Sequence, residues 1–433
     1  MTIKKRKFKK KKQLRNNEYY NIQNEFDKLY QQSKNNKKFK NLLEIIESEE
    51  NIQLAYRNIK RNTGSKTAGT NGNTIICLGN TKIKSLIQYV KNRLNNYKPQ
   101  TVRRVEIPKP NGKTRPLGIP TIEDRLIQQC IKQVLEPICE AKFHKNSYGF
   151  RPNRGTNHAI AMAMRFVNIE KYYHVVDIDI KGFFDNVDHS KLLKQIWSMG
   201  IQDKNLICII SKMLKAEING IGISNKGVPQ GGILSPLLAN IVLNELDWWI
   251  SNQWSTKKLN KQYGYEWNRK RMKQTNLKQV VMVRYADDFK LFCQTHEQAV
   301  KMYYATKQWL KERLNLDVSE EKTKIVNLKT GYSEFLGFKM KVHRKRNKWI
   351  VKSHISDKAK KQIKINIKQA IRELGRKKDK PSVQKLNATI LGIHQYYKIA
   401  TNVYIDFEKI AYGLTKSLKC RTKAFASNKR TQK

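Results

Sequence analysis

The chain has 433 residues, of which 39% are hydrophobic, and this is enough for about two or three folded domains. Lysine and arginine number 87 against 35 aspartates and glutamates, and the formal net charge of +52 predicts a polyanionic partner, either nucleic acid or an anionic membrane surface. No apolar stretch approaches the ~18 residues of a membrane span, and the six cysteines form no Cys-x-x-Cys pair, which argues against disulfide and zinc-finger folds.

The N-terminal part combines a basic arm with helices. Residues 4–12 (KKRKFKKKK) predict a solvated, disordered arm, and its charge also suits non-specific phosphate binding. The start has no apolar segment after its charges, so it is not expected to be a secretory signal. Apolar residues at helical spacing predict helices over 22–62. The loop 63–74 is rich in Gly, Ser, Thr and Asn but lacks the ending of a P-loop.

A basic hairpin comes next. Residues 102–138 predict two strands around a Pro-Asn-Gly turn, followed by a helix. Lys109, Lys113 and Arg115 flank this turn. These residues fit a solvated basic hairpin, and they equally fit a phosphate site, since the arginine fork binds two phosphate oxygens at once.

Aromatic and basic residues are interleaved over 147–160 (SYGFRPNRGTNHAI). Arg151 and Arg154 lie near Tyr148 and Phe150 in the sequence. This composition suits a nucleic-acid backbone with an exposed base stacked beside it.

Residues 174–189 (HVVDIDIKGFFDNVDH) begin with a short apolar strand. Because side chains alternate along a strand, Asp177 and Asp179 are expected on one face. Asp185 and Asp188 are better placed to cap the helix that follows. We predict Asp179 as the metal ligand of this segment, with Asp177 as the alternative.

A glycine-rich turn opens residues 227–250 (GVPQGGILSPLLANIVLNELDWWI), which continue as an apolar helix. The glycines allow close backbone approach to a base pair, and Gln230 can form a hydrogen bond within that contact. The polar and basic stretch 251–279 that follows is expected to be an exposed insertion.

Residues 280–293 (VVMVRYADDFKLFC) predict two short strands joined by a tight turn that carries carboxylates. Alone, an Asp-Asp pair is most simply an ordinary turn. If this hairpin neighbours the Asp179 strand in one sheet, however, Asp179 and Asp287 can hold two metal ions about 4 Å apart, the arrangement of in-line phosphoryl transfer. Mg²⁺ is the expected ion, with Asp288 assisting, because it takes carboxylates together with substrate phosphates.

The remaining chain is predicted to be mainly helical. An amphipathic helix is expected over 296–316, and residues 334–342 (EFLGFKMKV) suit a hairpin. From 356 onward a serine cap, periodic apolar residues and a glycine stop predict one helix, and two more helices follow. The apolar positions of the first of these helices are Ile363, Ile367, Ile371 and Leu374.

Three of these motifs, DIDIKGFFDNVDH, GVPQG with its following SP, and YADD, resemble in order and spacing a reverse transcriptase of the group II intron type. The resemblance covers roughly 75–420 and is strongest over 102–342. It implies an α+β right-hand polymerase, with fingers and palm built on antiparallel sheet and an all-α thumb, or maturase, bundle. The implied domains are a basic arm and helical extension (1–74), fingers and palm (75–345), the helical thumb (346–420) and a basic tail (421–433).

The same resemblance implies roles at the nucleotide. Lys109 and Arg115 would reach the triphosphate of the incoming nucleotide, beside Gln230. Phe184 falls where reverse transcriptases hold an aromatic ring that excludes a ribose 2′-hydroxyl, although an aromatic at a strand end is otherwise simply core. Lys322 would protonate the leaving pyrophosphate, although a surface lysine is by default solvated.

Template and primer contacts are implied as well. Arg151, Arg154 and Tyr148 match the segment of the family that contacts the RNA template, and 334–342 resembles the hairpin that grips the primer. The His-Asn-His endonuclease with Cys pairs that many relatives carry is not found in this sequence.

The resemblance predicts an RNA-directed DNA polymerase that binds its group II intron RNA, assists splicing, and uses an RNA template, a DNA primer and dNTPs in the bacterial cytoplasm, close to the nucleoid. A relative adopted by the cell for DNA repair or phage defence remains an alternative, as does an RNA-binding splicing factor without polymerase activity. A nucleotide cyclase shares the metal chemistry but not the hairpin and basic C-terminal helices. The sequence leaves open the cognate RNA, the primer source and the oligomeric state.

Overall fold

The structure is a computed structural model. It describes residues 14–108, 112, 114–257, 272, 275 and 277–427. Lys109, Lys113, the arm 4–12 and most of the 251–279 insertion lie outside the described residues. Helices combine with antiparallel sheets, which confirms the predicted mixed helix and sheet class. Two compact units are formed, the first by Met1–Pro152, Ile180–Trp249 and Thr306–Val318, and the second by Asn153–Asp179, Ile250–Ala305 and Ser319–Lys433.

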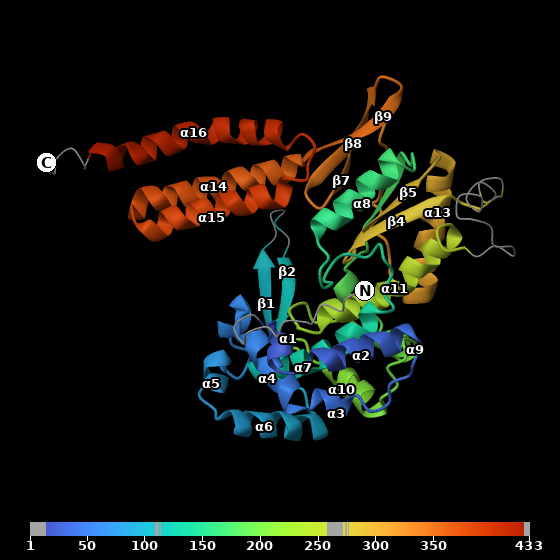
Figure 1. Ribbon diagram of the computed structural model, residues 1–433, viewed down its shortest axis with the longest axis vertical. Helices are drawn as coiled ribbons and strands as arrows, with labels where there is room; N and C mark the ends of the chain where they lie inside the picture. Colours follow the sequence, from blue (N-terminus) through green and yellow to red (C-terminus); the bar gives the residue numbers. More distant parts are fainter. Residues whose placement is uncertain are drawn as a thin grey trace, which may run out of the picture. The chain divides into compact units, whose positions relative to one another are not determined.

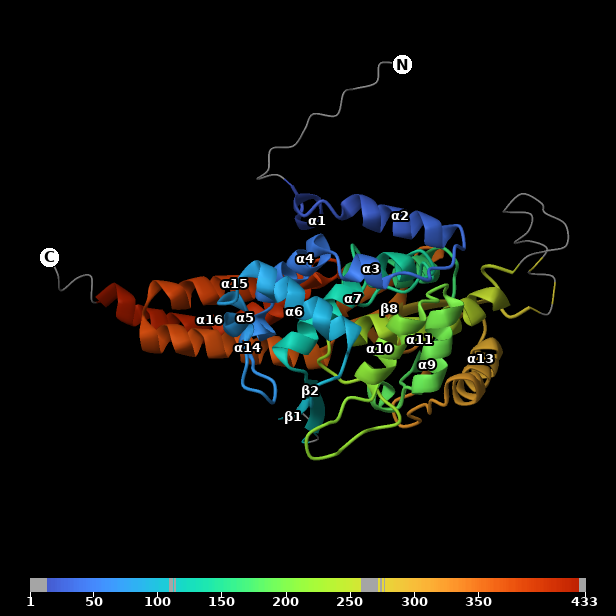
Figure 2. The same cartoon turned by 90° about the horizontal axis from the view of Figure 1, so that it is seen from below.

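The first unit is built around α7 (Ile122–Glu140), a helix buried over most of its length. Thr121 caps it by accepting a hydrogen bond from the backbone N–H of Asp124 at 3.4 Å. Helices α2 (Gln23–Lys34), α3 (Leu43–Ile46) and α4 (Glu49–Lys60) pack on α7, so the helices predicted over 22–62 are confirmed. Figure 2 shows α2, α3 and α4 in blue beside α7.

The basic hairpin of this unit is confirmed too. Strands β1 (Arg103–Pro108) and β2 (Thr114–Ile119) pair antiparallel, with Arg103 opposite Ile119. Further elements of the unit are α1 (Asn16–Tyr19), η2 (Thr63–Lys66), α5 (Ile75–Gly79), α6 (Ile83–Asn95), η3 (Phe183–Asp185), α9 (His189–Ser198), α10 (Lys204–Leu214), η4 (Leu310–Leu314) and most of α11 (Ser235–Gln253).

The second unit contains a four-stranded antiparallel sheet in the order β4-β5-β3-β6. Its strands are β3 (His174–Ile178), β4 (Val280–Tyr285), β5 (Asp288–Cys293) and β6 (Lys324–Asn327). Helix α8 (Thr156–Asn168) packs on this sheet, where Phe166 and Phe292 have ring centroids 5.9 Å apart. The direct pairing of β3 with β5 confirms that the two acid-bearing segments are neighbours in one sheet.

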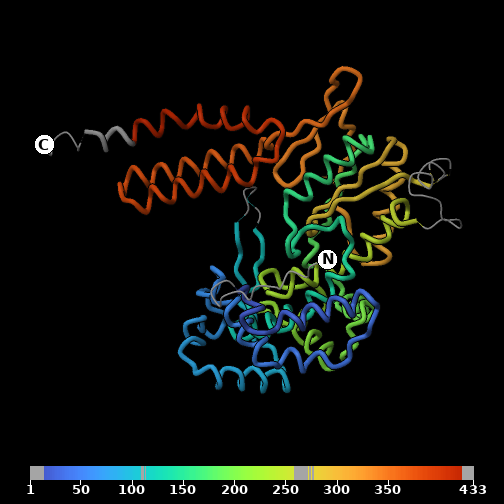
Figure 3. Tube along the Cα trace, viewed as in Figure 1, coloured from blue at the N-terminus to red at the C-terminus, as the bar shows by residue number. Residues whose placement is uncertain are grey.

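A three-stranded sheet, β7 (Ser333–Phe335), β8 (Phe338–Lys345) and β9 (Lys348–Ile355), follows α13 (His296–Trp309) and β6. Because β9 pairs along the whole of β8, the stretch 346–420 is not all helical, and its helices begin only at Asp357. The Cα trace in Figure 3 leads from this orange hairpin directly into the first of those helices.

Three long helices end the described chain: α14 (Asp357–Lys377), α15 (Lys380–Tyr397) and α16 (Val403–Ser427), side by side in Figure 1. The predicted core positions of α14 are all buried. The predicted stop at Gly375 is wrong, because α14 continues to Lys377. A Cβ at Gly375 would come within 3.3 Å of the Arg421 side chain, so this glycine admits close packing of α16 rather than ending α14.

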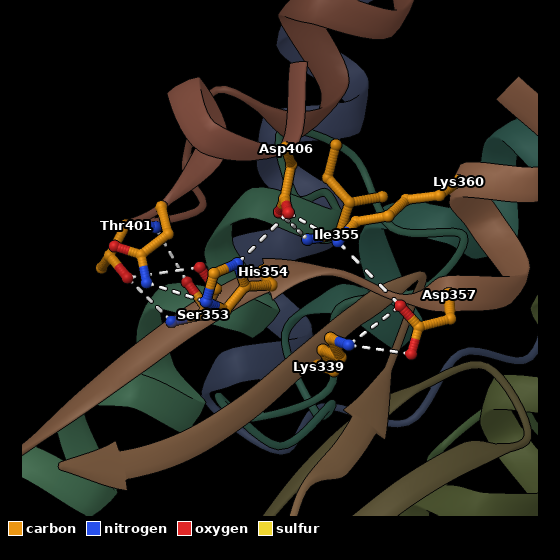
Figure 4. A network of polar contacts seen from close by, with 9 residues as sticks. Lys339, Ser353, His354, Ile355, Asp357, Lys360, Thr401 and Asp406 are labelled. Carbon is orange, nitrogen blue, oxygen red and sulfur yellow. Dashed lines mark hydrogen bonds and ion pairs between the residues drawn. The ribbon is translucent and has the colours of Figure 1, made fainter. Parts of the chain in front are cut away.

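A polar joint fixes β9 to the bundle (Figure 4). The buried carboxylate of Asp406 accepts a hydrogen bond from the backbone N–H of Ile355 at 2.7 Å and contacts the Lys360 ammonium at 2.5 Å. The Nδ1 atom of His354 lies 3.2 Å from the same carboxylate, and Lys339 of β8 pairs with Asp357 at 2.8 Å. The start of α14 and of α16 is thereby tied to the end of the hairpin.

Across the residues that the structure describes, no helix is at once long and apolar enough to cross a membrane.

Candidate active site

The turn between β4 and β5 carries two of the predicted acids. Tyr285 pairs with Asp288, which leaves Ala286 and Asp287 as a two-residue turn, as predicted. Ala286 has a φ of 58°, a left-handed conformation that is unfavourable for a residue other than glycine. The fully buried Arg284 donates from Nη1 to the Ala286 carbonyl oxygen at 2.8 Å and so helps to hold this turn.

The third predicted acid, Asp179, directly follows β3. Ile178 is paired with Phe289, so continuing the same register brings Asp179 beside Asp288. The backbone carbonyl of Asp179 accepts a hydrogen bond from Ser319 N–H at 2.8 Å, which fixes its position. Asp179, Asp287 and Asp288 therefore lie at one end of the sheet, at neighbouring strand positions.

The electrostatics of this end are dominated by negative charge. The pKa of Asp288 is raised to about 6, chiefly because surrounding protein atoms displace water from its carboxylate, although part of the residue remains exposed. Lys290 lowers that pKa, whereas the carboxylates of Asp177, Asp287 and Asp179 raise it. The like charges show that the acids are close enough to repel one another.

One cation already contacts these acids. The Lys322 ammonium lies 2.8 Å from Oδ2 of Asp179, and both side chains are exposed, at 68% and 43%. Within the described residues, no three acidic, histidine or cysteine side chains are gathered closely enough to enclose a metal ion. The donor chemistry nevertheless fits Mg²⁺: the acids offer only carboxylate oxygens, and their surplus negative charge attracts a cation.

Asp177, the alternative ligand, has another partner. It is 8% exposed, pairs with the Lys290 ammonium at 2.5 Å, and accepts a hydrogen bond from Ser333 Oγ at 3.0 Å. Lys290 is 2% exposed and was not singled out from the sequence. A lysine inside the otherwise apolar run from Phe289 to Cys293 is the signal that would have found it.

The first unit holds a cavity of about 340 Å³ lined by several of the predicted nucleotide-binding residues. Phe184 and Gln230 both contribute to its wall, together with Arg104, Asp185 and Lys226. Arg115 is joined to this group, because its Nε donates a hydrogen bond to Oε1 of Gln230 at 2.5 Å.

The glycine-rich turn brings Gln230 to the cavity. Its backbone is docked on two sides: Val228 N–H donates to the Phe184 carbonyl at 2.7 Å, and Gly118 N–H donates to the Gln230 carbonyl at 2.8 Å. Gly231 has a φ of 123°, and a Cβ there would come within 2.4 Å of the Gly118 carbonyl oxygen. Only glycine permits this approach of the turn to β2.

The two neighbouring phenylalanines, Phe183 and Phe184, lie in different environments. Phe183 is 2% exposed, whereas Phe184 is half-buried and lines the cavity. Strand alternation does not cause this, because β3 ends at Ile178 and both residues belong to the 3₁₀ turn η3. Gly182, with a φ of 54°, redirects the chain between the two elements. Asp188 caps α9, as predicted.

The predicted template residues are not arranged as expected. Arg151 is 6% exposed and donates to Glu140 and to the backbone carbonyls of His144 and Ser147. Tyr148 is also buried, at 5% exposed. The burial of these two side chains does not support their predicted contact with an RNA template. Arg154 is partly exposed, and Phe150, at 50% exposed, is the accessible aromatic residue of this segment.

Similarity to known proteins agrees with this geometry. Residues 107–370 match the family described as "Reverse transcriptase (RNA-dependent DNA polymerase)". Protein YkfC of Escherichia coli is 34% identical over 317 residues, 69% of this chain and 82% of that protein. Group II intron-encoded protein LtrA of Lactococcus lactis is 34% identical over 401 residues, which are 80% of this chain and 64% of LtrA, so the chain spans less than two thirds of that relative.

A yeast relative, the putative COX1/OXI3 intron 1 protein of Saccharomyces cerevisiae, is 28% identical over 73% of this chain and 42% of its own length. The two intron-encoded relatives agree with the group II type predicted from the three motifs. With more than half of its residues matched, the chain belongs to the reverse transcriptase (RNA-dependent DNA polymerase) family.

Proposed function

We propose that this protein is a group II intron-type reverse transcriptase that copies RNA into DNA with Mg²⁺ held by Asp179, Asp287 and Asp288. The observation that carries the proposal is that these three acidic residues occupy neighbouring strand positions at one end of the β4-β5-β3-β6 sheet, in a member of a polymerase family. In architecture, 75–345 would form fingers and palm, and the helices from Asp357 onward would form the thumb.

Bound Mg²⁺ would stabilise the negative charge that develops during in-line phosphoryl transfer. The protein's own contribution is to hold the three carboxylates in place through the Ala286 turn and the Asp179 backbone. A free Asp288 with a pKa of about 6 is ionised above that pH, so divalent cations would compete with protons in acidic solution.

Other residues would act on the nucleotide itself. Arg115, joined to Gln230, and Lys109, which lies outside the described residues, would bind the triphosphate. Phe184 would exclude a ribose 2′-hydroxyl. Lys322 would donate its proton to the pyrophosphate oxygen released as the P–O bond breaks, after its ion pair with Asp179 opens.

The proposed partners are a group II intron RNA, an RNA template with its DNA primer, and dNTPs. The net charge of +52 supports binding of polyanions, and lysines are among the exposed residues of α14 and α16. Because LtrA is named a group II intron-encoded protein, we assign the intron RNA to this chain as well, with assistance of splicing as the second role.

Primer extension on an RNA template tests the proposal. Asp287→Asn or Asp179→Asn should lower DNA synthesis by at least about a thousandfold, because transition-state charge stabilisation is lost, while RNA binding changes little. Glu297→Gln serves as the matched control, since this exposed carboxylate of α13 pairs with Lys301 and its loss should leave synthesis unchanged.

Substantial synthesis by either aspartate variant would contradict the metal assignment. Absence of synthesis by the wild-type protein, with RNA binding intact, would instead favour a splicing factor without polymerase activity.

A further inference from the structure

A buried lysine lies just behind the three carboxylates. Lys290 follows Asp288 by two residues in β5 and is 2% exposed. Its ammonium contacts Oδ1 of Asp177 at 2.5 Å, and Asp177 precedes Asp179 by two residues. Removing two charges from water can cost more free energy than their mutual attraction returns. The presence of a buried Lys290–Asp177 pair at this position therefore needs a reason.

Strand geometry puts these charges on the same face as the candidate metal ligands. Asp177 and Lys290 are directly opposite in the β3–β5 register, so their side chains share one face of the sheet. Alternation with period two brings Asp288 to the face of Lys290, and Asp179 to the face of Asp177 if the strand conformation extends one residue. The influence of both Lys290 and Asp177 on the pKa of Asp288 agrees with this proximity.

The surroundings of the pair keep it in place. Ser333 of β7 is fully buried and donates its hydroxyl to Asp177 Oδ1 at 3.0 Å. The Lys290 ammonium also lies 5.4 Å from the centroid of the Phe335 ring. The Asp177 carboxylate thus accepts a hydrogen bond from the Ser333 hydroxyl and pairs with the Lys290 ammonium. The Lys290 ammonium in turn lies between this carboxylate and the Phe335 ring.

We propose that Asp177 is a positioning residue for the metal site: it retains the Lys290 ammonium, so that a divalent cation and not this lysine neutralises Asp288 and Asp179. The proposal rests on the function proposed above. It assigns Asp177 a role other than that of a ligand, and it gives Lys290 a role that the sequence did not indicate.

The sign of the effect follows from Coulomb's law. With Asp177 neutralised, the site loses one negative charge, and the unpaired Lys290 ammonium repels a bound dication or contacts Asp288 itself. With both residues neutralised, the net charge of the site equals that of the wild type. Interactions between charges at this spacing are strong in a poorly hydrated interior, so the change in metal affinity should be large.

Three variants, Asp177→Asn, Lys290→Met and the double variant, test this at pH 8, which is above the pKa of Asp288. Two quantities are measured against Mg²⁺ concentration: the rise in melting temperature without nucleic acid, and the rate of primer extension. Asp177→Asn should raise the half-saturating Mg²⁺ concentration on the order of tenfold in both. The double variant should return it to within about twofold of wild type, and Lys290→Met should bind Mg²⁺ at least as tightly as wild type.

A matched control is the ion pair between Lys339 of β8 and Asp357 at the start of α14, outside the four-stranded sheet. Neutralising it by Lys339→Met with Asp357→Asn should leave the half-saturating Mg²⁺ concentration unchanged. If Lys290→Met does not fold, the comparison of Asp177→Asn with the double variant still decides the question.

Equal Mg²⁺ requirements in Asp177→Asn and wild type would overturn the proposal, even if melting temperatures fall, because a purely structural pair changes stability alone. Failure of the double variant to recover would overturn it as well. If Mg²⁺ neither stabilises the wild type nor supports its synthesis, the proposed function fails instead, and the two failures are thereby distinguished.

Discussion

Phe183 and Phe184 are adjacent, yet only the second reaches the cavity that Gln230 lines. A polymerase that uses dNTPs must reject ribonucleotides, which differ by one extra hydroxyl. A hydrogen-bonding site cannot do this, because the correct substrate lacks the group to be recognised, so rejection must be steric. The half-buried ring of Phe184, held by the docked turn 227–230, is suited to that role.

We therefore expect Phe184→Ala to raise the incorporation of rNTPs relative to dNTPs at least about tenfold, with modest loss of dNTP use, since one steric contact is worth on the order of 1–3 kcal/mol. Phe183→Ala is the control and should instead cost roughly 3–5 kcal/mol of stability, because its ring is buried. Single-nucleotide incorporation and thermal melts of both variants provide the measurement. If the Phe184→Ala protein rejects ribonucleotides as the wild type does, a residue other than Phe184 excludes the ribose 2′-hydroxyl.

At the same scale, residue types alone predicted the acids but not their partners. Alternation predicted Asp177 and Asp179 on one face of a strand, but β3 ends at Ile178, and the pattern did not distinguish a metal ligand from half of an ion pair. The distinction depends on Lys290, which lies 113 residues away and becomes a neighbour only through the β3–β5 register. The template contact predicted for Arg151 is unsupported for the same reason. Its carboxylate partner, Glu140, is the last residue of the preceding helix α7, and this contact holds the Arg151 side chain inside the protein.

Among the elements, the turn of the β7–β8 hairpin contacts helix α15 and so connects the three-stranded sheet to the helical bundle. Leu336 and Gly337 form its two-residue turn with φ values of 51° and 81°. A Cβ at Gly337 would lie 2.9 Å from the Tyr397 hydroxyl of α15, and Tyr396 donates its hydroxyl to the Leu336 carbonyl at 3.1 Å. The turn is thus fixed both by its own conformation and by α15.

Gly337→Ala should therefore lower stability by roughly 1–3 kcal/mol, through the positive φ and the contact with Tyr397. Adding Tyr397→Phe should recover the part due to the hydroxyl and leave the part due to φ. Gly392→Ala in α15 is the control: a Cβ there meets no atom within 4 Å, and alanine should stabilise the helix by roughly 0.5–1 kcal/mol. Denaturant melts measure all four proteins, and a neutral Gly337→Ala would show that the turn adjusts freely.

Element boundaries were predicted correctly where the hydrophobic periodicity is strong. The predictions were wrong where tertiary contacts determine the local conformation. The core positions of α14 and the hairpin 280–293 follow from their patterns and are confirmed. The conformation after Ile178 does not follow from the sequence pattern. A strand end was expected there, but the left-handed Gly182 and the hydrogen bonds of the turn 227–228 accompany the 3₁₀ turn η3. Gly375 resembles a helix stop in sequence but is a packing position against Arg421.

For the whole molecule, the formal charge of +52 is the property most directly linked to its nucleic-acid partner. Residues 4–12 carry eight of the basic side chains. If phosphate contacts dominate RNA affinity, each one releases counterions, and the logarithm of the binding constant should fall linearly with the logarithm of the salt concentration. A segment that takes part in those contacts contributes to the slope in proportion to the phosphates it neutralises.

Deleting residues 1–12 should therefore make this slope shallower by about 0.7 for each single-stranded phosphate that the arm neutralises, while primer extension stays measurable because the carboxylates are untouched. Replacing the eight basic residues of 4–12 by glutamine keeps the length and should reproduce the deletion, which separates charge from chain length. Binding of one RNA is measured from low to high salt for the three proteins. If the deletion flattens the slope and the glutamine variant does not, length rather than charge is responsible; if neither changes it, the arm takes no part in binding, and the phosphate contacts belong to the rest of the chain.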